Sequence, residues 1–202
     1  MGTGSIITIS REYGSGGKEI GKRLAEKLGI PYYDKEIIVL AAKQTGAPEK
    51  LFEENDEKGA TNSLIFSMSV LRDTAAGNFP LADRLFMVQS QIIHDVADKG
   101  AGVIVGRCAD YILKERENMI NIFIHAPMAD RVKRVVEEYG ISGDKAANEV
   151  VKTDKHRAAY YDYYSFLKWG QCDHYDLCVN SSVGLDNAVS LIAQYVEMQS
   201  NK

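Results

Sequence analysis

The chain of 202 residues has few of the features that mark membrane or secreted proteins. Its apolar runs stay well short of the roughly 20 residues that a membrane-spanning helix needs. Its N-terminus has no basic segment followed by a long apolar one, so no secretory signal is visible. We therefore expect no membrane association and a cytoplasmic location.

Cysteine is also scarce. Cys108, Cys172 and Cys178 are an odd number without C-x-x-C spacing, which argues against a disulfide framework and a zinc site. The four histidines show no H-E-x-x-H spacing, and no Gly-x-Ser-x-Gly sequence occurs. A structural metal and acyl-transfer chemistry are therefore not expected.

An excess of positive charge is absent as well, since the formal net charge is -4. This charge gives no general attraction to nucleic acid, but it leaves room for a local cationic pocket. The expected partner is a small anion. With 45% hydrophobic and 26% charged residues, the composition is that of a globular protein, and the length predicts one domain over residues 1–202.

Short apolar segments alternate with longer helical patterns. Strands are predicted at residues 6–10, 32–33, 103–105, 120–124 and 177–179, with helices at about 18–28, 35–44, from 48, 80–99, 128–139, 144–164 and from 185. Because such strands bury both faces of a sheet, the pattern predicts an α/β fold with a five-stranded parallel sheet flanked by helices. Residues 56–79 fit either a substrate-side flap or a loop packed on the core.

The clearest local signal lies between the first strand and the first helix, where residues 10–19 read SREYGSGGKE. Glycines let backbone N–H groups converge on a phosphate, Lys18 would reach the outer phosphates, and the helix N-terminus faces the anion. Against the pattern G-x-x-x-x-G-K-[ST], Glu12 replaces the first glycine and Glu19 the Mg²⁺-binding hydroxyl. A turn that binds nothing is the alternative. The predicted ATP phosphate-binding residues are Gly14, Ser15, Gly16, Gly17, Lys18 and Glu19.

Three segments together resemble the cytidylate kinase-like family. They read ISREYGSGGKEIGKRLAEKLGIPYYD, VIVGRCADYIL and WGQCDHYDLCVNSS and begin at residues 9, 103 and 169. The resemblance covers nearly the whole chain and implies a three-layer P-loop NTPase fold. It implies an acceptor-side helical region at 35–100 and a helical lid region at 140–172. It also implies ATP as phosphoryl donor, with Mg²⁺, and a nucleoside monophosphate such as CMP as acceptor.

The resemblance implies residues for the acceptor. Arg84 lies in the helix that supplies an acceptor-phosphate arginine in CMP kinases, and Gly106-Arg107 resembles the Gly-Arg that ends their third strand. An Asp follows that arginine in CMP kinases, whereas this chain has Cys108 there and Asp110 two residues on. The predicted acceptor-binding residues are Asp34, Arg84 and Arg107.

Cations gather where the resemblance implies the lid. Phosphoryl transfer depends on positive groups that close over the transferred phosphate. Residues 152–157, KTDKHR, resemble the charged lid segment, and Arg131 lies on the preceding helix. We expect Lys18, Arg131 and Arg157 to be catalytic. For any single lid cation, a solvated helix face paired with Asp154 or Glu149 is the alternative.

Three questions stay open at this stage. Mg²⁺ binds either to the Glu19 carboxylate directly or to phosphates, water and a residue such as Ser10 or Asp34. The aromatic segment 160–169 fits stacking on a nucleobase, but core or dimer contacts are the commoner use of such a stripe. A nucleotide-binding regulator without catalysis, or a P-loop kinase for another acceptor such as shikimate or dephospho-coenzyme A, is the alternative to a nucleoside monophosphate kinase.

Overall fold

A computed structural model of the chain describes residues 4–55 and 80–200. At its centre is a parallel five-stranded sheet in the order β2-β3-β1-β4-β5. The strands are β1 (Ile6–Arg11), β2 (Tyr32–Tyr33), β3 (Gly102–Val105), β4 (Met119–His125) and β5 (Leu177–Asn180). All five predicted strands are confirmed, and so is the α/β fold.

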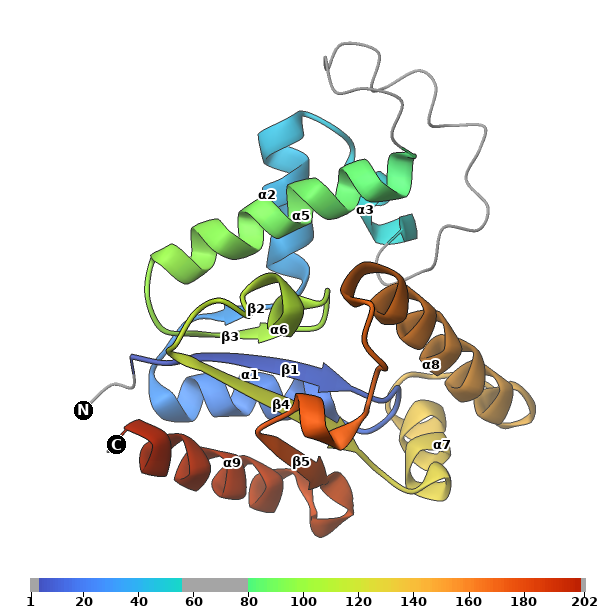
Figure 1. The fold of residues 1–202 in the computed structure, drawn as a ribbon. Coiled ribbons are helices and arrows are strands. Elements are labelled where there is room, and N and C mark those ends of the chain that lie inside the picture. Colours follow the sequence, from blue (N-terminus) through green and yellow to red (C-terminus); the bar gives the residue numbers. More distant parts are fainter. Residues whose placement is uncertain (1–3, 56–79, 201–202) are drawn as a thin grey trace.

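Helices cover both faces of this sheet (Figure 1). They are α1 (Gly17–Leu28), α2 (Lys35–Thr45), α3 (Glu49–Asn55), α5 (Leu81–Asp98), α6 (Ala109–Ile112), α7 (Met128–Glu137), α8 (Gly143–Ser165) and α9 (Leu185–Ser200), with 3-10 turns η1 (Cys172–His174) and η2 (Ser181–Val183). The sequence did not predict α6, η1 or η2. Among the described residues, no helix is both long and apolar enough to cross a bilayer.

The central strand β1 is buried on both sides because its side chains alternate between two cores. Ile7 and Ile9 pack with α1 and α9, whereas Ile6 packs with α2 and α5. The parallel pairing of β1 with β3 and β4 brings the carboxyl ends of the three strands to one edge of the sheet. Open α/β sheets bind their ligands at that edge.

Helices α7 and α8 lie beyond this carboxyl edge, next to the loop that follows β1 (Figure 1). Val135 of α7 packs with Val150 of α8, and Tyr13 of the loop packs against them. At its other end, α8 reaches α5, where Tyr164 stacks on Phe86 with ring centroids 3.8 Å apart. The aromatic segment therefore packs helix on helix. The division into acceptor-side and lid regions stays a prediction, and the alternatives for residues 56–79 lie outside the described residues.

Candidate active site

The loop between β1 and α1 has a conformation that requires glycine at two positions. Gly14 and Gly16 have φ angles of 78° and 79°, which residues with a side chain rarely adopt. A Cβ atom on Gly14 would lie 2.7 Å from the carbonyl oxygen of Arg131, and one on Gly16 would lie 2.7 Å from Leu185 Cδ2. Conformation and close approach therefore both exclude larger residues.

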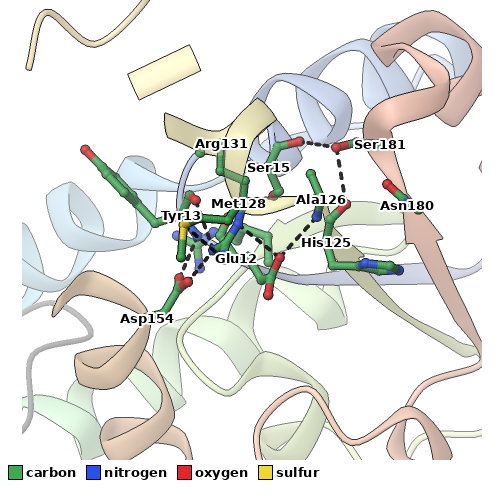
Figure 2. Close-up of polar contacts among 12 residues, drawn as sticks. Glu12, Tyr13, Ser15, His125, Ala126, Met128, Arg131, Asp154, Asn180 and Ser181 are labelled. Carbon is green, nitrogen blue, oxygen red and sulfur yellow. Dashed lines mark hydrogen bonds and ion pairs between the residues drawn. The ribbon is translucent and has the colours of Figure 1, made fainter. Parts of the chain in front are cut away.

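Side chains outside the loop hold its carbonyl groups. Arg131 Nη1 donates to the carbonyl of Tyr13 at 3.4 Å, and Ser181 Oγ donates to that of Ser15 at 2.6 Å (Figure 2). In a trans peptide the following N–H points the opposite way. The N–H groups of Gly14 and Gly16 therefore point away from α7 and η2, and among the described residues they have no hydrogen-bond partner.

Two cavities that share residues open beside this loop. The smaller has about 110 Å³ and is lined by Gly14, Gly16, Gly17 and Lys18 among others. The larger has about 420 Å³. Its charged lining consists of the cations Arg11, Lys18, Lys35, Arg107, Lys152 and Arg157, the carboxylates of Asp34, Glu53 and Glu149, and His156. Cations outnumber carboxylates, so this pocket is cationic although the chain is acidic, a possibility that the net charge left open.

Asp34 links the loop lysine to the end of β3. Its carboxylate lies 2.7 Å from Lys18 Nζ and 3.3 Å from Arg107 Nη1. Arg107 is fully buried and also donates to the carbonyl of Val105 at 3.1 Å. Burial raises the pKa of Asp34, but Arg107 and Lys18 outweigh it and hold the pKa below the usual value. The carboxylate therefore stays charged and joins two of the predicted site residues.

The turn after β3 directs Arg107 into the molecule. Gly106, Arg107 and Cys108 have φ angles of 74°, 59° and 55°, and the two residues with side chains are strained there by about 1–3 kcal/mol each. Asp110 in α6 is buried, and its carboxylate accepts a hydrogen bond of 2.7 Å from the hydroxyl of Tyr161. Burial raises the pKa of Asp110. Asp110 therefore serves the packing of α8 and does not line the larger cavity.

The other predicted residues fall into two groups. Arg157 lines both cavities and donates to the carbonyl of Arg11 at 3.0 Å. Arg131, Arg84 and Glu19 line neither cavity. Arg131 is buried between two carboxylates, and Glu19 pairs with Arg23 at 2.9 Å. The structure thus brings Lys18, Asp34, Arg107 and Arg157 to the two cavities. Arg131 contacts the glycine loop from outside these cavities, through the carbonyl of Tyr13.

Sequence reasoning overlooked Arg11, which lines both cavities. A usable signal was present, because a charged residue ends an apolar strand immediately before the glycine loop. Lys152 and His156 also line the larger cavity. They lie in the predicted lid segment, but they were not predicted as site residues from the sequence. The role of Asp154, whose Oδ1 accepts from the N–H of Tyr13 at 2.7 Å, has no sequence signal, because the two residues are 141 positions apart.

A third cavity of about 310 Å³ lies on the outer side of the loop, between α7 and η2. Its lining includes Lys133, Arg134, Ser181 and Ser182. Arg134 Nη1 also donates to the carbonyl of Gly14 at 2.8 Å. Because Arg134 and Ser181 both bond the loop, this cavity adjoins the glycine segment.

Comparisons with known proteins agree with this architecture. The sequence model of the cytidylate kinase-like family matches residues 6–183. A cytidylate kinase of Pyrococcus horikoshii is 27% identical over 179 residues, which are 88% of this chain and 80% of the relative. One of Saccharolobus islandicus is 24% identical over 196 residues, 96% of this chain and 92% of the relative.

Solved structures are similar over nearly the whole chain. An uncharacterized protein from Eubacterium ventriosum has a TM-score of 0.70 and 32% identity, with 96% of this chain and 98% of that chain covered. A shikimate kinase from Bacteroides thetaiotaomicron has a TM-score of 0.58 at 14% identity, with the same coverage. At that identity the second likeness supports the fold alone.

Proposed function

Because the chain belongs to the cytidylate kinase-like family of P-loop phosphotransferases, we propose that it transfers the γ-phosphoryl group of ATP to a nucleoside monophosphate, with CMP as the first candidate. One observation carries this proposal. The N–H groups of Gly14 and Gly16 lack a protein partner and belong to residues that line a cavity beside Lys18. Buried N–H groups are nearly always paired, so an anionic ligand is their natural partner.

The donor fits the two cavities that adjoin the loop. Its phosphate chain would occupy the smaller cavity, where the loop amides, Lys18 and the positive end of α1 meet. The nucleoside would extend into the cavity between α7 and η2, which Arg134 and Ser182 line. Lys18 would exchange its contact with Asp34 for the phosphates, and its side chain, 57% exposed, has room to do so.

The acceptor fits the larger cavity because its lining is cationic. Arg107 and Lys152 would bind the acceptor phosphate, and Arg157, which lines both cavities, would neutralise the group in transfer. An acceptor phosphate is already an anionic nucleophile, so no strong base is needed. Arg84 stays a predicted acceptor ligand.

Mg²⁺ requires oxygen ligands, and it usually takes one or two carboxylates together with the substrate phosphates. Asp34 fits this need, because its carboxylate lines the larger cavity next to Lys18. The ion would neutralise charge on the phosphates. Glu19 pairs with Arg23 outside both cavities, and its direct binding to Mg²⁺ stays a prediction.

The proposal is tested by ADP release from ATP and Mg²⁺ with CMP, dCMP, UMP, AMP, GMP, shikimate and dephospho-coenzyme A as separate acceptors. We expect turnover with CMP that is lost in Lys18→Ala. Turnover with another acceptor alone would correct the substrate. ATP binding that depends on Lys18, without turnover on any acceptor, would instead identify a nucleotide-binding regulator.

A further inference from the structure

Arg131 joins the phosphate loop to two carboxylates from different parts of the chain. Its Nε lies 3.4 Å from Glu12 Oε2, and its Nη1 forms an ion pair with Asp154 and donates to the carbonyl of Tyr13 (Figure 2). The Arg131 side chain is only 8% exposed. A buried arginine with this many partners fixes the positions of all of them.

Glu12 stands where phosphate loops usually have their first glycine, and here it fixes the start of the loop. Its Oε2 accepts from the N–H of Ala126 at 3.0 Å, and its own N–H donates to the carbonyl of Ile124, also at 3.0 Å. The hydroxyl of Ser15 donates to the Glu12 carbonyl at 2.8 Å. The unusual residue therefore fastens the loop to the end of β4.

Asp154 holds the same loop from α8. Its Oδ1 accepts from the N–H of Tyr13 at 2.7 Å, while Arg131, its ion-pair partner, donates to the carbonyl of Tyr13. Both peptide groups that flank Tyr13 are thus oriented by one ion pair. Because the carbonyl of Tyr13 and the N–H of Gly14 share a peptide plane, this pair also sets the direction of the Gly14 N–H.

We propose that Asp154 and Arg131 are positioning residues that hold the loop amides in their phosphate-binding orientation. The proposal rests on the proposed function, since it assigns these residues to the donor site of that reaction. It gives Arg131 a role through the loop and not at the transferred group. Helix α8 then serves both substrates, because its Lys152 and His156 line the larger cavity while its Asp154 orients the donor loop.

The test is calorimetric binding of AMP-PNP with Mg²⁺, and of tripolyphosphate, to Asp154→Asn. We expect both dissociation constants to rise about tenfold, because the charge-assisted contact to the Tyr13 N–H and the pair with Arg131 are weakened. The matched control is Asp98→Asn, which removes a carboxylate paired with Arg116 near the opposite edge of the sheet. Its dissociation constants should stay within about twofold of wild type.

Hydrogen exchange separates positioning from general destabilisation. In Asp154→Asn, amides of residues 12–17 should exchange faster while those of the central strands keep their protection. If this variant does not fold, Arg131→Lys serves instead, since a lysine keeps the charge but cannot reach both carboxylates and the Tyr13 carbonyl. We expect the same tenfold loss.

The outcomes distinguish the two proposals. Binding that is weakened by Lys18→Ala, but not by Asp154→Asn or Arg131→Lys, would overturn the positioning role and leave the proposed function intact. Wild-type protein that binds neither AMP-PNP nor tripolyphosphate would overturn the proposed function, and the positioning role with it.

Discussion

The carboxylate of Asp34 touches two cations, so its charge state is coupled to folding. Its pKa lies below the usual value because Arg107 and Lys18 outweigh the effect of burial. A carboxyl whose pKa is lowered by folding stabilises the protein above its unfolded pKa of about 3.9, and this stabilisation is lost as the pH falls through the folded pKa.

We therefore expect Asp34→Asn to be less stable than wild type at neutral pH, by about 1–3 kcal/mol. The difference should shrink as the pH falls below about 4. Urea unfolding at a series of pH values measures it. Parallel stability curves for the two proteins across this range would show that Asp34 is not held in its charged form by Arg107 and Lys18.

Gly14 and Gly29 allow two effects of an added side chain to be separated: the strain of a positive φ angle and the clash with neighbouring atoms. Gly14 and Gly29 both have positive φ angles, but a Cβ atom on Gly29 would meet nothing within 4 Å, whereas one on Gly14 would collide with the Arg131 backbone. Gly29→Ala should lower the free energy of unfolding by about 1–2 kcal/mol, because alanine is strained at a positive φ angle.

Gly14→Ala should lower the free energy of unfolding by more than Gly29→Ala does. It should also abolish binding of AMP-PNP, because the loop must shift to make room for the added methyl group. Thermal unfolding and calorimetry measure the two effects. If both alanine variants lose equal stability and both bind AMP-PNP as wild type does, the close approach of the loop to α7 is unimportant.

Site residues could be predicted from the sequence where the residues that act together are neighbours in the chain. The glycines and Lys18 stand together in one segment, so their spacing alone indicates a phosphate loop. Arg131 was expected at the transferred group, but it is buried with Glu12 and Asp154. Its partners lie 119 and 23 positions away, and composition and periodicity cannot detect such pairs.

At the scale of elements, α8 depends on its aromatic contact with α5. Phe86 stacks on Tyr164 with an interplanar angle of 4° and meets Tyr160 edge-on. Phe86→Ala should therefore lower the free energy of unfolding by about 2–3 kcal/mol, since Phe86 is only partly buried. Urea unfolding is the measurement.

The neighbouring Met87 provides the control on the same helix, because its side chain is 48% exposed. Met87→Ala should change stability by less than about 0.5 kcal/mol. An equal effect of the two substitutions would mean that the stacked pair does not fasten α8 to α5.

Strands and long helices were predictable because their burial patterns are regular. The strands β1, β3 and β4 are covered on both faces, and most of their residues are isoleucine or valine or other apolar residues. The four-residue α6 was missed because it follows a turn in which Arg107 and Cys108 adopt positive φ angles. No propensity rule predicts that conformation for these residue types.

At the scale of the whole molecule, the fold explains how an acidic chain can have a cationic pocket. The parallel order of the sheet brings the ends of β1 and β3, the start of α1 and the side chains of α8 to one edge, where cations outnumber carboxylates. The family match over residues 6–183 confirms the resemblance seen in the sequence.

Transfer of the phosphoryl group can be followed with a label. ATP labelled in the γ-phosphate is incubated with Mg²⁺ and a mixture of CMP, UMP, AMP and GMP, and the products are separated by chromatography. We expect the label to appear in one nucleoside diphosphate, and we expect Lys18→Ala to slow this transfer by about 100-fold or more. Label that stays in ATP, or transfer at the same rate in wild type and Lys18→Ala, would contradict this expectation.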